Sequence, residues 1–406
     1  MVTIVGAPAI GMRGATVRRL SERQRQRLLR VSALRGRSKQ RERRRREAVI
    51  RTVRISSGKP SDTITIFGPD GLQYATLQGE RRPAPAVVSL SANPDETLKF
   101  LDQTRQSLHD QWVQFPRNRS RRHATKSAPL VVRSYWDYSS IERIGPDAAL
   151  VLASQYDRFR RKGGWTPRAV DIDKWNPEVR AELDGVGFLE LVGVAHAGPP
   201  YVDVGTRRIL KFQANDEAYG QQVFKMLTDL GVNENLHLID LYSCIVEAIV
   251  NTRQHAYPAD ILFEQPHVPN WWLAASLDHA KRRLRVTVVD HGATIPRTLP
   301  RWERYPAFAR GFRKLLRREL HPDPDDDGYD GAALAVAMAV GRTATEKEYR
   351  GKGLAFIESV LGLCNTGRLS IYSRRGSYIR TKGSKPFYAT RPTPIRGTLV
   401  AWDLGL

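Results

Sequence analysis

The stretch that decides the fold of the C-terminal half is EAIVNTRQHAY, residues 247–257. It ends an apolar segment that we predict as one helix over residues 237–257, with Glu247, Asn251 and His255 at four-residue spacing. Residues four apart in an α-helix project from one face, with about 40° of drift per step. A polar stripe on an otherwise apolar helix is costly to bury unpaired. The spacing therefore predicts a polar face that lines a wet cavity.

This polar face has the residue types of a site for a cation and phosphates. Asn251 offers a neutral oxygen, and Mg²⁺ prefers oxygen ligands while it keeps several waters. Glu247, one turn earlier, can orient or deprotonate an attacking water. Two interpretations of His255 stay open: a contact on the phosphate side, or a polar residue satisfied elsewhere. Glu247 and Asn251 alone would favour a surface stripe on an amphipathic helix.

Three further segments favour the interpretation that this polar face lines a cavity over that of a surface stripe. The predicted strand LRVTVVDHG ends in Asp290 and Gly292. A carboxylate there can accept a hydrogen bond from an exocyclic amine such as that of adenine, and glycine lets the backbone approach a flat base. The segment RGKGL, residues 350–354, precedes a predicted helix, and such a helix start presents free N–H groups to phosphate. The pair Gly397 and Thr398 opens the last predicted strand.

In this order, the four segments resemble the N-box, the two glycine boxes and the last strand of the ATP-binding superfamily of gyrases, heat-shock chaperones, histidine kinases and MutL (GHKL). The resemblance covers residues 207–406 and implies ATP and Mg²⁺ as cofactors. It implies that Asn251 holds Mg²⁺, that Glu247 is the catalytic base and that Asp290 reads the adenine amine. The ATP-binding residues that we predict on this basis, besides Asn251, are His255, Asp290, Gly292, Gly351, Lys352, Gly353 and Thr398.

Two features depart from this pattern. The first glycine box usually has a second glycine, and Thr294 stands in its place, which puts the flexibility of that loop in question. Histidine kinases carry a phosphorylatable histidine on a two-helix hairpin ahead of the ATPase domain. We find no such hairpin in the sequence and do not expect an ordinary sensor kinase.

The N-terminal globular segment resembles a sulphate-transporter and anti-sigma-antagonist (STAS-like) domain over residues 63–200, in its order of strand, loop and long helix. Antagonists of that family carry a phosphorylatable serine just before the long helix. Here Ile144, Gly145, Pro146 and Asp147 occupy that place, without a hydroxyl, so we expect no phosphoswitch of the usual type. A generic α/β domain is the alternative.

The N-terminal arm is strongly basic. Between Arg13 and Arg54 the chain has 17 Arg or Lys against three Glu, within a total net charge of +23. Such an arm attracts polyanions and predicts a non-specific nucleic-acid partner through residues 13–54. A solvated arm without a partner is the alternative, since aromatic stacking residues are missing from it.

Length and composition set the organisation. With 406 residues, 41% hydrophobic and 26% charged, the chain fits two or three globular domains. We predict an α/β protein with a basic, disordered arm (1–55), an STAS-like domain (56–204) and a GHKL-type ATPase domain (205–406) built as a mixed sheet with helices on one face. Two cysteines and no apolar run near the roughly 20 residues of a membrane helix predict a cytoplasmic protein without a membrane partner.

The function predicted from these features is an ATPase or ATP-dependent regulatory protein kinase that acts through the STAS-like domain or a partner protein. A non-hydrolysing nucleotide sensor or scaffold and a nucleic-acid-associated protein are the alternatives. The segment HPDPDDDGYDG opens like a calcium loop, but its twelfth position is Leu334 and not Glu, so we predict no calcium site. Because it lies between the glycine boxes, we predict a mobile part of an ATP lid.

Overall fold

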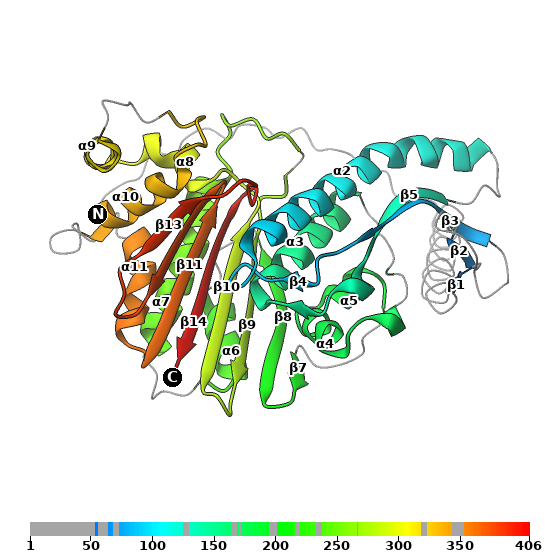
Figure 1. Ribbon diagram of the computed structural model, residues 1–406, viewed down its shortest axis with the longest axis horizontal. Coiled ribbons are helices and arrows are strands. Elements are labelled where there is room, and N and C mark those ends of the chain that lie inside the picture. Colours follow the sequence, from blue (N-terminus) through cyan, green and yellow to red (C-terminus); the bar gives the residue numbers. More distant parts are fainter. Residues whose placement is uncertain are drawn as a thin grey trace, which may run out of the picture.

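The fold is shown by a computed structural model of the chain (Figure 1). The structure describes residues 53–55, 64–67, 73–124, 130–163, 169, 172–194, 201–215, 220–232, 238–265, 267–317, 323–342 and 353–406. The predicted arm lies outside these residues except for its last three. In the described part of the chain, no helix has both the length and the apolar character needed to cross a membrane.

A single eight-stranded sheet forms the centre of the molecule, in the order β13-β12-β11-β14-β10-β9-β8-β7. Every neighbouring pair is antiparallel. The combination of helices and sheet was predicted, but the mixed sheet was wrong; short turns, which permit only antiparallel pairing, join β7 to β8, β9 to β10, β11 to β12 and β12 to β13. The strands are β7 (Tyr201–Val204), β8 (Arg207–Asn215), β9 (Trp271–Asp278), β10 (Arg283–Asp290), β11 (Thr366–Ser373), β12 (Gly376–Thr381), β13 (Phe387–Thr390) and β14 (Thr398–Gly405).

Both faces of this sheet are buried. Trp271 and Leu273 of β9 pack into one hydrophobic cluster, whereas Trp272 and Ala274 between them pack into another. Successive side chains of a strand point to opposite faces, so each cluster marks one face. All eight residues of β9 are buried, which explains why its sequence is apolar without alternation.

The first face is covered by helices of the C-terminal half, which lie behind the sheet in Figure 1. Helix α7 contributes Leu241, Ile245 and Ile249 to a core that also contains Leu273 and Trp402 of the sheet. Helices α8 to α10 add a smaller cluster at one end of this layer. The helices are α6 (Gly220–Asp229), α7 (Leu238–Asn251), α8 (Ile295–Thr298), α9 (Tyr305–Leu316), α10 (Asp330–Arg342) and α11 (Gly353–Ser359).

The second face is covered by the N-terminal part of the chain, with α2 and α3 in front of the sheet in Figure 1. One continuous core joins Leu150 of α3 to Trp272, Val289 and Leu399 of the sheet. The helices of residues 205–406 pack on the first face only, as predicted for that segment, and the N-terminal layer covers the other face. The elements of this layer are β4 (Val87–Val88), α2 (Pro94–Ala124), β6 (Arg143–Ile144), α3 (Pro146–Gly163), α4 (Pro177–Gly185) and α5 (Phe188–Leu191).

A second, four-stranded sheet lies to the side, in the order β1-β2-β3-β5. Its strands are β1 (Val53–Ile55), β2 (Ile64–Phe67), β3 (Gln73–Pro83) and β5 (Leu130–Asp137), of which β3 and β5 are parallel.

Two predicted local features differ from this. The composition of PRNRSRRHATKS, residues 116–127, predicts a basic loop, whereas helix α2 continues to Ala124 and so through most of this segment. The predicted boundary between residues 204 and 205 falls in the β7–β8 turn, so β7 belongs to the large sheet.

Candidate functional site

A cavity of about 360 Å³ opens between α7, the ends of β10 and β14, and the segment that leads into α9. Five of the nine predicted site residues line it, and they come from three elements that are far apart in the sequence. These five residues are Glu247, Asn251, His255, Asp290 and Thr398. The predicted polar face of the helix is thus brought to the same place as the two strand ends.

The helix that carries the first three residues changes geometry inside the motif. Helix α7 ends at Asn251, and residues Thr252–Ala256 form one π-helical turn. The prediction of one regular helix through residue 257 was wrong here, so His255 does not follow the i+8 position of an α-helix. Such π turns occur frequently at functional sites, because they shift the side chains beyond them. His255 is exposed and still borders the cavity.

Partial burial shifts the pKa values of the titratable side chains that α7 and the π turn present to the cavity. Glu247 is half-buried, and this burial raises the pKa of its carboxyl. The pKa of His255 is lowered by partial burial of its ring, so the imidazole is neutral at pH 7. A carboxyl with a raised pKa is a suitable proton acceptor near neutral pH.

Asp290 is the most strongly perturbed group of the cavity. The backbone N–H of Gly292 donates to its Oδ1 at 2.9 Å, and Thr252 Oγ1 donates to its Oδ2 at 3.2 Å. Although these hydrogen bonds favour the ionised form, desolvation raises the pKa of the carboxyl to about 7. A buried, hydrogen-bonded carboxyl at the cavity wall can accept a hydrogen bond from a bound ligand.

Thr398 stands directly opposite Asp290 in the pairing of β14 with β10. Its hydroxyl lies 2.8 Å from the hydroxyl of Ser373. The preceding Gly397 has φ +149°, and a side chain there would place its Cβ 2.0 Å from the carbonyl oxygen of Asp290. Only glycine fits this approach, so the Gly–Thr pair sets how closely the end of β14 meets Asp290.

Gly292 is positioned differently from what the sequence predicted. It does not line the cavity, and an added Cβ would lie 2.2 Å from the carbonyl oxygen of Ala256. The close approach that requires glycine is made by the π turn and not by open space for a flat base. Thr294 has ordinary extended backbone, with φ −86°, so its position in place of a second glycine produces no strain.

The second glycine box is covered only in part. Gly351 and Lys352 lie outside the residues that the structure describes, and Gly353 is the first residue of α11. Leu354 and Ile357 of α11 border the cavity. The start of this helix therefore faces the same space as Asn251.

Six polar residues of the cavity wall were missed from the sequence, among them Thr252 and Arg304. Thr252 bonds to Asp290, and its place directly after Asn251 is the signal that could have found it. Arg304 lines the opposite wall at the start of α9. Nothing local distinguishes it from the other arginines of the chain, so sequence reasoning had no means of selecting it.

The donor set fits Mg²⁺ only together with phosphates. Among the described residues there is no group of three or more His, Cys, Asp or Glu that could hold a metal ion. Asn251 and Glu247 offer oxygen atoms to the cavity. Mg²⁺ in proteins usually keeps several waters and takes further oxygens from substrate phosphates, and a site with few protein ligands suits that arrangement.

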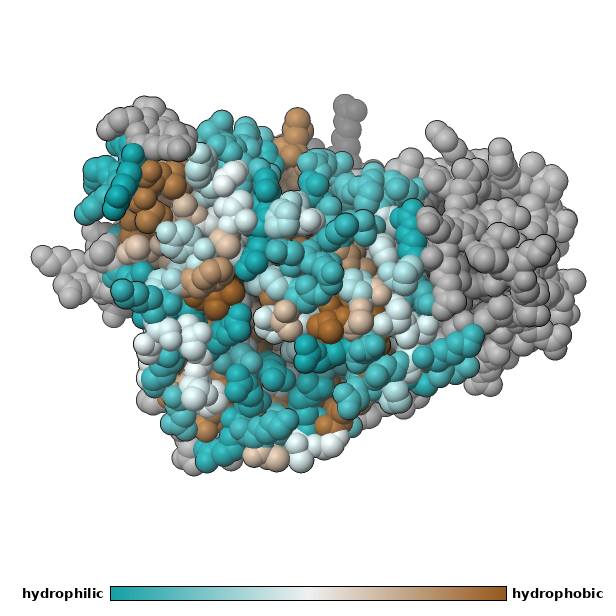
Figure 2. All heavy atoms as spheres, in the orientation of Figure 1, coloured by the Kyte–Doolittle hydropathy of each residue, from teal (hydrophilic) through white to brown (hydrophobic). Residues whose placement is uncertain are grey.

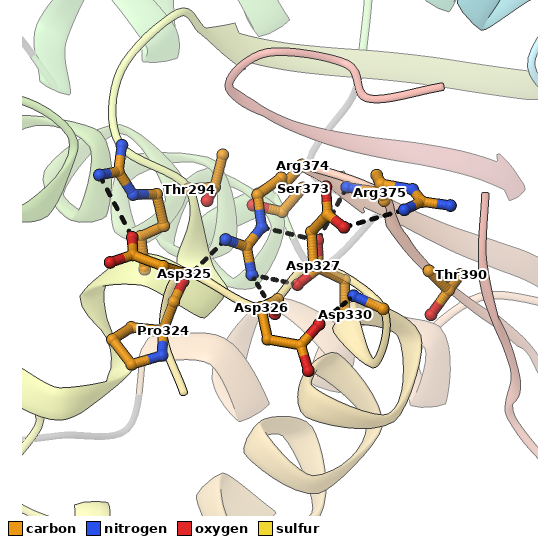
Figure 3. Close-up of polar contacts among 12 residues, drawn as sticks. Thr294, Pro324, Asp325, Asp326, Asp327, Asp330, Ser373, Arg374, Arg375 and Thr390 are labelled. Carbon is orange, nitrogen blue, oxygen red and sulfur yellow. Dashed lines mark hydrogen bonds and ion pairs between the residues drawn. The ribbon is translucent and has the colours of Figure 1, made fainter. Parts of the chain in front are cut away.

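The acidic segment next to the cavity is held by an arginine rather than by a metal (Figure 3). Arg374 donates to the carbonyl oxygens of Pro324 and Asp326 at 2.7 and 2.9 Å, and to Asp330 Oδ2 at 2.8 Å. Its guanidinium thus binds oxygens of the segment that opens like a calcium loop. The described part of this loop is tied to the β11–β12 turn, contrary to the mobile lid segment predicted from the sequence.

No family model, no curated protein and no solved structure matches this chain. The resemblance to the GHKL superfamily therefore rests on the order of the four boxes and on the residues that meet in the cavity.

Proposed function

We propose that the chain binds ATP with Mg²⁺ in this cavity and acts as an ATPase or as an ATP-dependent regulatory kinase. Asp290 and Thr398 recognise the adenine, and Asn251 supplies the protein oxygen for Mg²⁺. Gly351, Lys352 and Gly353 contact the phosphates from the start of α11, and His255 adds a contact at the mouth. The observation that carries the proposal is the meeting of Glu247, Asn251, Asp290 and Thr398 in one cavity of about 360 Å³.

The size and the wall of the cavity support this ligand. Pockets for small molecules and cofactors typically have volumes of about 300–1,000 Å³, with a few polar groups on a largely apolar wall. Here Val288, Val400 and Ile357 form apolar wall, and Asp290 adds a hydrogen-bond acceptor at its edge. This combination suits a flat base with an exocyclic amine.

Glu247 is the residue that we propose for catalysis. Its half-buried carboxyl lies one helical turn before Asn251, so it can orient a water or an acceptor group next to the phosphates. Burial raises its pKa, which brings the carboxyl closer to the pH at which a general base is most effective. In this proposal the bound Mg²⁺ neutralises charge that develops on the phosphates.

The N-terminal layer is the element through which the proposed switch acts. His291, next to Asp290, places its ring Nε2 2.8 Å from Ser154 Oγ of α3. Trp272 of β9 donates from its indole Nε1 to Asp157 of α3 at 3.0 Å. A conformational change at Asp290, in the first glycine box, is thus only one residue away from the contact of His291 with α3. This layer is where we place the STAS-like function or the docking of a partner protein.

A non-hydrolysing nucleotide sensor is the second candidate, since the same cavity can bind without turnover. The two are separated by incubation of γ-labelled ATP and Mg²⁺ with the protein alone and with cell lysate. Phosphate release from the protein alone supports an ATPase, and a labelled protein band supports a kinase. Binding with neither product supports the sensor.

Asn251 provides the test of the site itself. Calorimetry of Asn251→Ala should show that the Mg²⁺-dependent part of ATP affinity is lost, because the variant removes the oxygen ligand. Gln254→Ala is the matched control, since Gln254 also borders the cavity but has no proposed role. Unchanged affinity in folded Asn251→Ala would refute the assignment.

A further inference from the structure

Arg105 of α2 and Arg158 of α3 are buried, and neither forms an ion pair with a carboxylate among the residues that the structure describes. Arg105 of α2 is 8% exposed and Arg158 of α3 is 7% exposed. Arg158 donates from Nη2 to the neutral Oε1 of Gln265 at 3.2 Å. Among the described residues, Arg105 Nε and Arg158 Nη1 are buried atoms with no hydrogen-bond partner. A buried charge is expensive unless it is paired, so two such charges side by side call for a negative partner.

The nearby carboxylates do not neutralise them. Asp102 and Glu264 both accept from Arg396, at 3.2 and 2.6 Å. Asp157, the residue before Arg158 on α3, accepts from Arg160 and Arg161 at 2.8 and 2.6 Å. Arg105 and Arg396 thus share the charges of Asp102 and Glu264, and both of these carboxylates are bound to Arg396.

The pKa values report the same imbalance. Burial, followed by the positive charges of Arg158 and Arg396, lowers the pKa of Arg105 to about 9. Burial also lowers the pKa of Arg158 to about 10. Both groups stay protonated at pH 7, so Arg105, Arg158 and Arg396 together exceed the charge of Asp102 and Glu264 by one positive charge.

Neutral polar groups beside these arginines are also unpartnered. Thr104 is fully buried and its hydroxyl has no hydrogen-bond partner in the described part of the chain. The same holds for Oε1 of Gln155, which is 2% exposed and lies one helical turn before Arg158. Unpartnered buried polar atoms are rare in folded proteins, and four of them lie on two neighbouring helices here.

We propose that Arg105 and Arg158, with the hydroxyl of Thr104, bind a phosphate dianion, either inorganic phosphate or the phosphate group of a small molecule. Guanidinium groups suit the geometry of phosphate oxygens. A phosphate monoester carries a charge of about −1.5 to −2 at pH 7, so it can form ion pairs with both guanidinium groups at once. The site lies on the α3 face of the sheet, whereas the ATP cavity lies on the opposite face.

The position of the site relates it to the first glycine box. The pKa of the His291 ring is held far below its usual value, first by burial and then by the charges of Arg158 and Arg105. The backbone N–H of His291 donates to the hydroxyl of Tyr257 at 3.2 Å. A phosphate bound to the two arginines would therefore lie near the end of β10, on the α3 face of the sheet. In Figure 2 the side chains over the coloured, N-terminal part of α2 are largely hydrophilic.

Thermal unfolding of the full chain tests the proposal. Inorganic phosphate and glycerol 2-phosphate are titrated at constant ionic strength, with chloride as the reference anion. We expect a saturable rise in Tm of a few degrees in the wild type, and loss of that rise in Arg105→Met and Arg158→Met. Arg180→Met, at an exposed arginine of α4, should respond as the wild type does. A response to the monoester alone would identify an organic phosphate as the ligand.

Further variants distinguish phosphate binding at the two arginines from phosphate binding in the ATP cavity and from a purely structural role of the arginines. Asn251→Ala should keep the full response, because its cavity lies on the other face of the sheet. Replacement of an unpaired buried charge by Met removes a desolvation cost, so Arg105→Met should be no less stable than the wild type in chloride. Arg105→Lys keeps the charge but loses the planar donors, and its phosphate affinity should fall several-fold.

Three outcomes overturn the proposal. They are a wild type that responds to phosphate no more than to chloride, a response that survives in both Met variants, and an equal loss of stability of the Met variants with and without phosphate. The last outcome would assign the arginines a purely structural role.

Discussion

At the scale of single residues, Asp290 makes stability depend on pH. An ordinary Asp titrates at about 3.9 when unfolded, whereas burial raises the pKa of Asp290 to about 7 in the folded protein. The stability that the protonated carboxyl of Asp290 contributes is therefore fully present below the pKa of the unfolded state. This stability is lost as the pH rises through about 7. As the pH rises from 6 to 8, the free energy of unfolding measured with urea should fall less in Asp290→Asn than in the wild type, because the amide does not ionise. Parallel curves for the two proteins would contradict the assigned pKa.

Glu247 carries the prediction for turnover. Glu247→Ala should retain ATP affinity and lose phosphate release, because a general base acts on the attacking group and not on the bound ground state. General-base catalysis typically contributes about 10²–10⁴-fold to the rate, so the rate constant should fall by that factor. Thr298→Ala, at a residue of the same cavity without a proposed role, is the control. An equal loss of binding and turnover in Glu247→Ala would assign Glu247 to ground-state binding.

The site residues differed in how well local sequence patterns could predict them. Asn251 and Asp290 were predictable because each lies at a fixed place in its element, a helix face and a strand end. Gly292 was predicted for the wrong reason, since its partner is the carbonyl of Ala256, which is set by the π turn. Arg304 was not predictable, because its place in the cavity depends on how the segment before α9 folds back.

At the scale of elements, the loop held by Arg374 gives a stability prediction. Arg374 pairs with Asp330, and their side chains are 12% and 1% exposed. Removal of one partner of a buried pair leaves an uncompensated charge and costs about 3–5 kcal/mol. Burial raises the pKa of Asp330 even beside Arg374, so protonation relieves part of this cost. Arg374→Met should therefore lower the free energy of unfolding by about 3 kcal/mol, at the lower end of that range.

The neighbouring Arg375 is the matched control for this measurement. It pairs with Asp327, and their side chains are 30% and 44% exposed. Exposed ion pairs contribute about 0–1 kcal/mol, so Arg375→Met should change the free energy of unfolding by no more than that. Urea unfolding of the two variants decides the question. Similar losses for both would mean that Arg374 does not secure the loop.

Strands and helices were predicted well where one local signal determines them. The strand predicted at LRVTVVDHG is such a case, because its apolar pattern is local and β10 (Arg283–Asp290) lies there. The π turn after Asn251 was not predictable, because one extra residue in a turn leaves the apolar pattern of the preceding helix unchanged. The parallel pairing of β3 with β5 joins segments separated by α2, and no local pattern reports such a pairing.

At the scale of the whole molecule, the docking of the N-terminal layer on the sheet was the largest feature that the sequence did not reveal. It depends on contacts such as Tyr372 of β11, whose hydroxyl donates to the carbonyl of Leu90 at 2.7 Å. These residues are 282 positions apart, and periodicity reports only neighbours. The near-continuous apolar strands β9 and β10 were the available hint, since a strand that is apolar on both faces needs two covering layers.

The basic arm provides the last prediction. With 17 Arg or Lys against three Glu between Arg13 and Arg54, the chain should bind DNA or RNA without sequence preference. Affinity should fall steeply as salt rises, because release of condensed counterions drives such binding. Base-specific readout requires side chains that are positioned on a rigid element, and the sequence of the arm shows none.

A deletion tests the arm separately from the ATP cavity. Because β1 (Val53–Ile55) pairs with β2, the deletion should stop at residue 50 so that this sheet is preserved. It should abolish nucleic-acid binding in a filter assay and leave ATP affinity intact, since every predicted ATP-binding residue lies beyond residue 240. Replacement of the arginines of residues 41–46 by glutamine should give a partial loss with a smaller salt slope. Binding that is insensitive to salt, or that survives the deletion, would refute the electrostatic role. A loss of ATP affinity on deletion would instead place the arm on the ATP-binding half, where its charge could meet the phosphates.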